Sequence, residues 1–271
     1  MNLSCNLEFV NISDIGQKRP HNEDSTASDL RCGLAIVADG MGGYKAGEVA
    51  SAIAATMVMH DVTQGLNNIK TDEVDTKTGF RQQSILIKNA ITRANSTIYM
   101  TAHEDEQCKG MGTTIVMGLF YGDKVTIANV GDSRSYRFRN NEFQQITKDH
   151  SLFQEVIDRG LYTPEEAEAN TPKNLVTRAL GIDADVKIDI IEEQVLAGDI
   201  YLLCSDGLTD MVNDEEIHLT LSKYSANLAH AAENLVRLAN KYGGKDNISV
   251  VLAQIGNMKS KNNGKFRKFF N

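Results

Sequence analysis

The sequence contains no tryptophan, and it has only three prolines and four cysteines among 271 residues. So few prolines exclude a proline-rich linker. The cysteines form no C-x-x-C pair and do not have the spacing of a zinc site. Scattered cysteines of this kind are typical of a reducing compartment, so we expect a cytoplasmic protein. They are Cys5, Cys32, Cys108 and Cys204.

Long hydrophobic runs are also missing. No apolar stretch approaches the roughly 18 residues that a transmembrane helix requires. The first residues lack the basic and apolar regions of a signal peptide. The sequence therefore predicts no membrane span and no secretory leader.

Basic residues are fewer than acidic residues. Lysine and arginine number 28 against 36 acidic residues, which gives a formal net charge of −8. This balance argues against nucleic acid as a partner of the whole surface. An acidic total also arises when carboxylates are gathered to hold divalent cations. The hydrophobic content of 41% is ordinary for a globular protein, and the length allows one large domain or two small ones.

The first half of the chain predicts strands followed by two long helices. Alternating apolar residues indicate a strand over 7–15, and a continuous apolar run indicates a buried strand over 32–38. Between them, residues 16–25 are expected to form a polar loop. Helical spacing begins at Ala46 and returns over 81–102, with a loop over 64–80 between the helices.

The second half predicts a strand-rich segment with a polar insertion. Short apolar runs separated by turn residues favour an antiparallel sheet. Residues 149–174 are polar and helical, and Thr163-Pro164-Glu165-Glu166 has the pattern of a helix N-terminus. The expected strands are 115–121, 124–130, 135–139, 186–195, 200–204 and 248–255, and the expected helices are 214–221 and 225–242.

The end of the chain differs in kind. Residues 257–271 contain five basic residues, three phenylalanines and no acidic residue. A loose, solubilising end is the simpler interpretation. The alternative is a weak membrane-surface or partner anchor that combines cations with aromatic rings.

Chemistry is first indicated at Val37-Ala38-Asp39-Gly40-Met41-Gly42-Gly43. An apolar run ends there in one carboxylate and three glycines, which allow the backbone to approach a ligand closely. Taken alone, the segment could also be a tight strand-to-helix connection with an incidental acid.

The same pattern recurs elsewhere in the chain. Asp39, Asp132, Asp206 and Asp246 each lie at the edge of an apolar run. If these edges converge, the carboxylates would repel one another unless cations neutralise them. No histidine or cysteine shares the positions, so an all-oxygen site for Mg²⁺ or Mn²⁺ is predicted. Any one of these acids alone could instead cap a turn.

Two divalent ions held in this way can activate a water and stabilise the leaving oxygen of a phosphoryl group. Such chemistry also needs a cation that binds phosphate, and an arginine fork fits phosphate oxygens best. Arg19, four residues before Glu23, is the candidate.

The sequence resembles the metal-dependent protein phosphatases of the PP2C (PPM) family, in their bacterial form. The matching segments occur in the family's order and span about residues 8–255. They are Arg19-Pro20-His21-Asn22-Glu23-Asp24, the Asp39 segment, Gly110-Met111-Gly112-Thr113-Thr114, Gly131-Asp132-Ser133-Arg134, Thr147-Lys148-Asp149-His150-Ser151, Thr177-Arg178-Ala179-Leu180-Gly181, Ser205-Asp206-Gly207-Leu208 and Asp246-Asn247.

The resemblance implies an α+β fold, a four-layer α-β-β-α sandwich of two antiparallel sheets flanked by helices. It implies a phosphatase domain over residues 1–256, with a variable flap at about 150–175 and the basic segment 257–271 outside it. The implied activity is hydrolysis of phosphoserine and phosphothreonine in proteins by a binuclear Mg²⁺ or Mn²⁺ centre and a metal-activated water. Implied partners are phosphorylated substrate proteins and a serine/threonine kinase that the enzyme opposes.

Site roles also follow from the resemblance, position by position. Asp39 would bridge both core ions, one of them completed by Glu23 and the Gly40 carbonyl. Asp206 and Asp246 would hold the other core ion. A third, weaker site would use Asp132 with Asp206 and, tentatively, Asp210, and Arg19 would bind the phosphate.

One position departs from the eukaryotic relatives, which place a histidine after the Asp-Gly as a proposed proton donor to the leaving alcohol. Met41 stands there, as is usual in bacterial members, and a thioether cannot donate a proton. A metal-bound water or another group would have to serve. His21 is a weaker candidate for that role, and His150 is expected to be a structural hydrogen-bonding residue.

Two other functions stay open at this point. A pseudophosphatase would shield phosphorylated partners without hydrolysing them, but it would be expected to lack a metal ligand. A two-metal phosphodiesterase or nuclease would use the same chemistry, but the acidic net charge counts against it.

Overall fold

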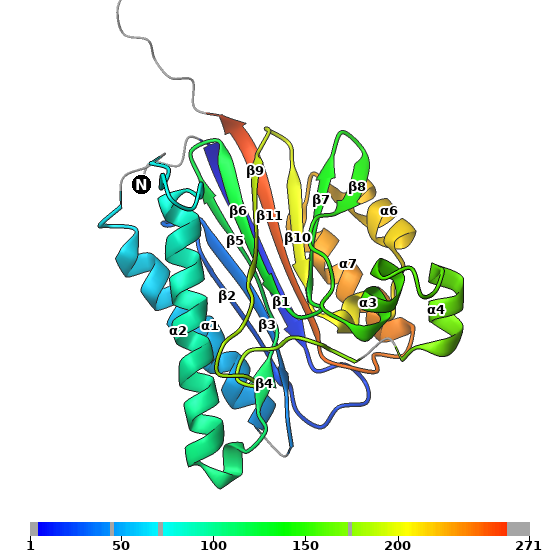
Figure 1. Ribbon diagram of the computed structural model, residues 1–271. Coiled ribbons are helices and arrows are strands. Elements are labelled where there is room, and N and C mark those ends of the chain that lie inside the picture. The colour runs from blue at the N-terminus through cyan, green and yellow to red at the C-terminus, as the bar shows by residue number, and fades with distance from the viewer. Residues whose placement is uncertain (1–4, 44–45, 70–72, 173–174, 259–271) are drawn as a thin grey trace, which may run out of the picture.

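Two antiparallel β-sheets stack face to face at the centre of the computed structural model, and helices cover both outer faces (Figure 1). The structure describes residues 5–43, 46–69, 73–172 and 175–258. Most of the basic segment 257–271 lies outside these ranges. None of the helices within them is long and apolar enough to cross a membrane.

The first sheet has five strands in the order β1-β11-β10-β7-β8. Its strands are β1 (Cys5–Asp14), β11 (Ile248–Met258), β10 (Ile200–Cys204), β7 (Arg134–Arg139) and β8 (Glu142–Gln145). The second sheet has the order β2-β3-β5-β6-β9, with β4 paired to β3. Its strands are β2 (Asp24–Asp29), β3 (Leu34–Met41), β4 (Gly112–Thr113), β5 (Ile115–Tyr121), β6 (Lys124–Val130) and β9 (Asp189–Gln194).

Apolar side chains between the sheets form the inner core. Phe120 of β5 meets Tyr201 of β10 edge to face, with ring centroids 5.4 Å apart. Ile127, Ala253 and Ile255 pack around this pair and are buried. Burial of such aromatic and aliphatic surface is the main contribution that holds the two sheets together.

Helices bury their apolar faces on the outside of each sheet. The second sheet is covered by α1 (Ala46–Gly65) and α2 (Gln82–Glu104), and the first by α6 (Asp214–Tyr224) and α7 (Leu228–Lys241). These contacts complete the four layers, so the predicted α-β-β-α sandwich is confirmed. The remaining helices are the short 3₁₀ turn η1 (Glu106–Cys108) and α3 (Leu152–Asp158), α4 (Pro164–Asn170) and α5 (Asp206–Thr209).

The sequence prediction missed the two-residue strand β4 and the polar strands β2 and β8. The expected loop over 16–25 already becomes strand at Asp24, because β2 pairs with β3 along its whole length despite lacking apolar alternation. Strand β8 follows a two-residue turn in which Asn140 and Asn141 both have positive φ, at 51° and 62°. Such a turn matches the twist of a hairpin, and β8 pairs with β7 beyond it.

The insertion between β8 and β9 contains the flap. Its helix α4 begins as predicted, because Thr163 and Glu166 form a reciprocal capping box at the N-terminus. The Thr163 amide donates to Glu166 Oε2 at 2.9 Å, and the Glu166 amide donates to Thr163 Oγ1 at 3.2 Å. In Figure 1 the two flap helices lie to the right of the lower part of the sandwich.

Candidate metal centre

Chain segments from both sheets meet at the lower end of the sandwich in Figure 1. Strands β3, β6 and β10 end there and β11 begins there, so the predicted strand-edge carboxylates come from four different strands. Asp39 is fixed by its backbone. Its amide donates to Thr114 Oγ1 at 3.1 Å, and its carbonyl accepts from the Thr114 amide at 2.9 Å.

Gly40 lies where no side chain would fit. A Cβ there would collide with the Gly47 carbonyl and would lie 2.5 Å from the Glu23 carbonyl. A Cβ on Gly47 would in turn lie 2.8 Å from the Gly40 carbonyl carbon and 3.0 Å from the Glu23 carboxyl carbon. The Gly40 carbonyl and the Glu23 carboxylate therefore flank the same glycine at the start of α1.

The Asp206 and Asp246 segments also pack tightly on each other. Asp206 opens α5 directly after β10, and a Cβ on Gly207 would collide with the Asn247 carbonyl. Asn247 ties this region to the polar loop after β1. Its side-chain amide donates to the carbonyls of Ile15 and His21, and its Oδ1 accepts from the Glu23 amide.

Asp132 sits in a tight turn between β6 and β7, which we name the Asp132 turn (residues 131–134). Gly131 has a φ of +110°, a conformation that residues with a side chain rarely adopt. Asp132 is 7% exposed and the adjacent Ser133 is fully buried. Ser133 Oγ lies 2.7 Å from Thr114 Oγ1, so the turn is hydrogen-bonded to the residue that also fixes Asp39.

The structure adds one carboxylate to which sequence reasoning gave no role. Asp24 lies opposite Asp39 in the β2–β3 register, and its Oδ2 accepts a hydrogen bond from Ser205 Oγ at 2.8 Å. Its position beside Glu23 in the Arg19–Asp24 motif was the available signal. Only the pairing of the two strands shows that it faces Asp39.

The carboxyls of this cluster raise one another's pKa. Burial raises the pKa of Asp24 to about 6, that of Asp132 to about 6 and that of Asp206 to about 8. Asp39 is partly accessible to solvent, yet burial and then the charges of Asp24, Asp206 and Asp132 raise its pKa well above the usual range. Burial is the larger physical cause of these raised pKa values, and repulsion between neighbouring carboxylates adds to it.

The donors present fit a hard divalent cation. Asp24 Oδ1 and Asp206 Oδ1 are buried and accept no hydrogen bond. An unsatisfied buried carboxylate oxygen is costly, and a cation would supply the missing partner. Every donor in the cluster is an oxygen, which suits Mg²⁺ or Mn²⁺ and disfavours zinc.

The carboxylates are not yet arranged around an ion. Across the described residues, no three histidine, cysteine, aspartate or glutamate side chains are spaced to hold a metal. Asp246 Oδ2 instead accepts from Arg19 Nη2 at 2.5 Å. A cation held by Asp246 would have to replace this contact.

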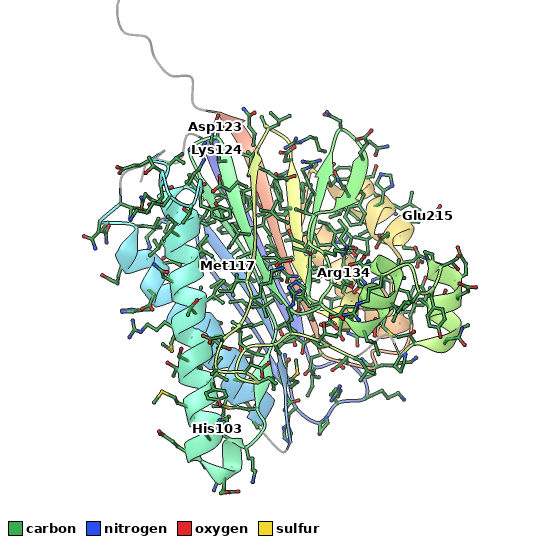
Figure 2. The ribbon with its side chains drawn as sticks, viewed as in Figure 1. His103, Met117, Asp123, Lys124, Arg134 and Glu215 are labelled. Atoms are coloured by element: carbon green, nitrogen blue, oxygen red, sulfur yellow. The ribbon has the colours of Figure 1, made fainter. Side chains whose placement is uncertain are left out.

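Beside the cluster lies a cleft of about 520 Å³. Asp132, Asp206, Asp210 and Asp246 line it together with residues of β7, of the flap and of the loops around α5 and β11. Figure 2 shows Arg134 beside the flap helices at this cleft. A larger hollow of about 640 Å³ lies between β2 and α1, but it has only Asp29 among its acidic lining residues.

The two histidines and Met41 occupy different environments. His21 is exposed, and its backbone carbonyl accepts from Asn247. Met41 is partly buried and pairs with Gly112 of β4. His150 is 5% exposed and fully engaged in hydrogen bonds, which agrees with the structural role expected of it.

A sequence profile described as protein phosphatase 2C matches residues 16–252. The chain belongs to the protein phosphatase 2C family. The predicted family is thereby confirmed, and with it the enzyme class of a metal-dependent protein phosphatase.

Curated and solved members of the protein phosphatase 2C family extend over nearly the whole chain. The serine/threonine phosphatase stp of Listeria monocytogenes is 36% identical over 245 residues, which cover 89% of this chain and 93% of the relative. The Mycobacterium tuberculosis serine/threonine phosphatase PstP/Ppp superposes with a TM-score of 0.81 at 36% identity and covers 93% and 99% of the two chains.

A second PstP structure contains two manganese ions. That catalytic domain is 37% identical to this chain, with a TM-score of 0.75, and covers 93% and 99% of the two chains.

Proposed function

We propose that this enzyme hydrolyses phosphoserine and phosphothreonine in proteins, using two or three divalent cations held at the lower end of the sandwich. The observation that carries the proposal is the cluster of carboxylates at the strand ends, in which Asp24 and Asp206 each have one buried oxygen without a hydrogen-bond partner. The named relatives, which are serine/threonine phosphatases, support the same substrate class.

The proposed ligands divide into three sets. Asp39 bridges the two core ions, Glu23 and the Gly40 carbonyl complete one, and Asp206 and Asp246 hold the other. When bound, such ions activate a water for attack on phosphorus and neutralise charge on the phosphoryl oxygens. The manganese pair in the related PstP structure supports Mn²⁺ or Mg²⁺ in these core sites.

A third cation site would lie on the cleft side. Asp132 and Asp206 would form it, with Asp210 as a further contributor. Charge on Asp210 raises the pKa of both Asp132 and Asp206, so all three carboxyls lie within electrostatic reach. Asp24, opposite Asp39, would hold the bridging carboxylate in place rather than bind substrate.

Arg19 would bind the phosphate of the substrate. Its guanidinium is 47% exposed and lies at the edge of the carboxylate cluster, where it pairs with Asp246. The charges of Glu23 and Asp39 also raise its pKa, so it lies within electrostatic reach of both carboxylates. With cations bound, Asp246 would be released from Arg19, and the planar fork would be available for two phosphate oxygens.

The leaving alcohol needs a proton that Met41 cannot give. His21 is exposed and lies within electrostatic reach of Glu23. Water at the centre is the other source. Replacing His21 with alanine separates the two, because only a direct donor role would change the alkaline limb of the rate profile.

The substrate would be a phosphorylated protein, and a serine/threonine kinase of the same cell would be the enzyme that it opposes. We place the reaction in the cytoplasm and the catalytic unit within residues 1–256. The basic segment 257–271 would be available for a membrane or partner contact outside that unit.

Hydrolysis of p-nitrophenyl phosphate and of a phosphothreonine peptide with added Mn²⁺ tests the proposal. Asp39→Asn is expected to lower kcat on the order of 100-fold or more, since it removes the bridging ligand. Wild-type protein that binds the phosphopeptide but hydrolyses neither substrate with any divalent metal would contradict the proposal and favour a pseudophosphatase. Cleavage of DNA or RNA with Mn²⁺ would favour the phosphodiesterase alternative.

A further inference from the structure

Two consecutive residues, Asp149 and His150, hold the Asp132 turn from both ends. His150 bonds to Gly131, the residue before Asp132, and Asp149 bonds to Arg134, two residues after it. Their side chains reach opposite ends of the same turn. Asp149 and His150 also lie where the flap, at about residues 150–175, begins.

His150 makes a reciprocal pair of bonds with Gly131. The Gly131 amide donates to His150 Nδ1 at 3.0 Å, and the His150 amide donates to the Gly131 carbonyl at 2.9 Å. Nε2 lies 3.2 Å from Asp189 Oδ2 and 3.1 Å from Arg178 Nη1. Because Nδ1 accepts, the neutral ring carries its proton on Nε2 and donates it to Asp189. Asn129 Nδ2 also donates to the Gly131 carbonyl at 3.2 Å. The conformation of Gly131 is thus set by His150 and Asn129.

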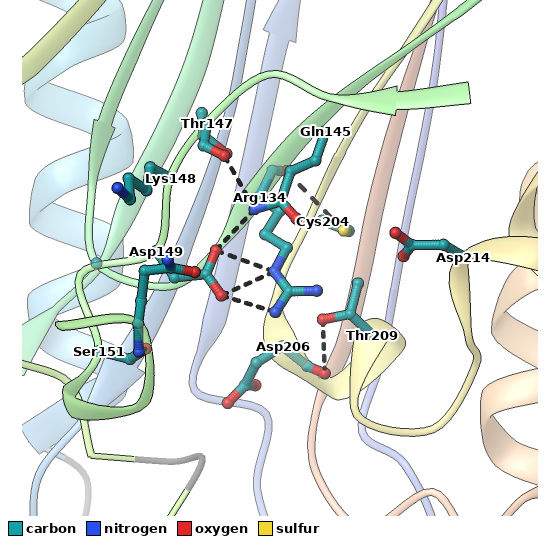
Figure 3. A network of polar contacts seen from close by, with 12 residues as sticks. Arg134, Gln145, Thr147, Lys148, Asp149, Ser151, Cys204, Asp206, Thr209 and Asp214 are labelled. Carbon is teal, nitrogen blue, oxygen red and sulfur yellow. Dashed lines mark hydrogen bonds and ion pairs between the residues drawn. The ribbon is translucent and has the colours of Figure 1, made fainter. Parts of the chain in front are cut away.

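Asp149 holds Arg134 with a fork of charge-assisted bonds (Figure 3). Arg134 Nε and Nη2 donate to Asp149 Oδ2 at 2.9 and 2.7 Å, and Gln145 Nε2 donates to Asp149 Oδ1 at 2.9 Å. Arg134 Nη1 donates to the Tyr136 hydroxyl at 3.0 Å, and that hydroxyl donates to Asp214 Oδ1 at 3.1 Å. Bidentate arginine–carboxylate pairs fix orientation as well as distance.

The same two residues begin the flap. The flap root consists of residues 150–152 and 175–177, joined by an isolated bridge between Ser151 and Val176. The Thr177 amide donates to the His150 carbonyl at 2.7 Å, and the Leu152 amide donates to the Leu175 carbonyl at 2.8 Å. A shift of the flap root would therefore move His150, and with it Gly131.

The Asp132 turn continues toward the bridging carboxylate. Ser133 Oγ lies 2.7 Å from Thr114 Oγ1, which accepts from the Asp39 amide at 3.1 Å. Hydrogen bonds at Gly131 and at Ser133, joined by the backbone of the Asp132 turn, thus connect the flap root to the backbone of Asp39. A contiguous network of this kind can carry energetic coupling between two places in a protein.

We propose that Asp149 and His150 are positioning residues that tie the flap root to the Asp132 turn, so that cation binding at Asp132 and order in the flap root depend on each other. The inference rests on the proposed function, since it takes Asp132 as a cation ligand. Coupling between two sites is reciprocal in binding free energy. If order in the flap root raises the affinity of Asp132 for a cation, cation binding must increase order in the flap root by the same free energy.

Amide hydrogen exchange with and without Mn²⁺ tests the proposal. In the wild-type protein, Mn²⁺ is expected to slow exchange of the Leu152 and Thr177 amides by about tenfold, within the usual range of coupling between sites. In Asp149→Asn the slowing should fall below about twofold, because the fork on Arg134 is lost. The Val195 amide, which donates to Asp123 at 3.0 Å far from the cleft, reports global stability.

The matched control is Asp199→Asn at the other end of β7. Asp199 forms a similar fork with Arg139, at 2.8 and 2.6 Å, so this change also leaves a half-buried guanidinium without its carboxylate. It should lower global stability comparably and leave the Mn²⁺ response of the flap root unchanged. Equal responses in the two variants would overturn the proposal.

His150 provides a second, independent pair of variants should Asp149→Asn not fold. Asparagine can present an oxygen near the position of Nδ1 and accept the Gly131 amide, whereas leucine cannot. The Mn²⁺ response should survive in His150→Asn and be lost in His150→Leu. Wild-type protein that hydrolyses phosphothreonine peptide with Mn²⁺ but shows no protection of the flap root overturns the coupling alone; one that does neither overturns the proposed function as well.

Discussion

The two ends of the β-sandwich treat buried carboxylates in opposite ways. At the far end, Asp199 is 1% exposed at its side chain and binds Arg139 through both oxygens, while Glu193 pairs with Arg137. At the cleft end, Asp24 and Asp206 each keep one buried oxygen without a hydrogen-bond partner. The far end neutralises these acids with the chain's own arginines, whereas no arginine forms an ion pair with Asp24 or Asp206 among the described residues.

The difference separates a structural ion pair from a ligand-binding site. A buried carboxylate that faces an arginine fork is already compensated. A group of carboxylates that face one another has raised pKa values and is stable only when protonated or bound to cations. The cleft end therefore depends on an external cation or on protons, whereas the far end does not.

The strongest test of this comparison removes one carboxylate charge at each end. Asp206→Asn should lower kcat for phosphopeptide on the order of 100-fold or more, because it removes a proposed ligand. In metal-free protein the same change should raise stability by about 1–2 kcal/mol, since it relieves repulsion in the cluster. Asp199→Asn should do the reverse, keeping activity and losing about 2 kcal/mol.

Steady-state kinetics and urea unfolding measure both effects of this pair. If Asp206→Asn destabilises the metal-free protein as much as Asp199→Asn does, the cleft carboxylates are ordinary structural groups and the comparison fails.

Glycine substitutions at the two ends should also differ. Gly40→Ala places a Cβ against the backbone carbonyls of Gly47 and Glu23, neither of which can move freely. We expect a loss of about 2–3 kcal/mol in stability and of about tenfold or more in activity. Gly198→Ala at the far end meets no atom within 4 Å and is strained only by its φ of +92°, so a cost of about 1 kcal/mol is expected.

Thermal unfolding and phosphatase assays of these two alanine variants decide the point. A Gly40→Ala protein with wild-type activity would show that the Gly40 carbonyl needs no fixed position.

The pH dependence of stability should come from the cleft end. The pKa values of Asp132 and Asp206 in the folded, metal-free protein are about 6 and about 8, against an ordinary value of 3.8. A folded state that holds protons more tightly than the unfolded chain loses stability as pH rises through these values. The Tm of the metal-free protein should therefore fall between about pH 4 and about pH 8.

Added Mn²⁺ should raise the Tm more at the alkaline end of that range than at the acidic end, because protons and the cation compete for the same oxygens. Scanning calorimetry after chelation measures this, with Asp206→Asn as the control expected to flatten the slope. A Tm increment from Mn²⁺ that is independent of pH would contradict the interpretation.

The smallest expected effect concerns one arginine at each end of the sandwich, Arg19 and Arg139. Arg19→Lys keeps the charge but loses the fork, so KM for p-nitrophenyl phosphate should rise about threefold to tenfold with a smaller change in kcat. Arg139→Lys, at the far end, should leave KM unchanged. Initial-rate kinetics at saturating Mn²⁺ measure both, and an unchanged KM in Arg19→Lys would remove Arg19 from the phosphate site.

The sequence correctly predicted those strands that are marked by local runs of apolar residues. Strands β3, β5, β6, β10 and β11 are apolar runs bounded by turn residues, so their ends and the acids at those ends could be located. The expected site residues lie together around the cluster and the cleft. Their roles as ligands remain predictions that the variants above would test.

What the sequence did not reveal depends on contacts between distant residues. Strand β2 is polar along its length and exists because β3 offers it a backbone ladder. The importance of Asp24 follows from its register opposite Asp39. The Arg134–Asp149 fork joins residues that are 15 positions apart in the chain. Such pairings arise only when the sheets assemble, and local propensity does not report them.

The flap root also bears on how this protein could change over evolution. The chain segments that enter and leave the flap are joined by a β-bridge between Ser151 and Val176. The Leu152 amide also donates a hydrogen bond to the Leu175 carbonyl at 2.8 Å. A segment whose ends are already joined can be lengthened, shortened or exchanged at little entropic cost. Changes in the length of the flap beyond its root should therefore be tolerated. An insertion between Asp149 and His150 would instead separate the Asp149–Arg134 contact from the His150–Gly131 contact, and so disturb the Asp132 turn.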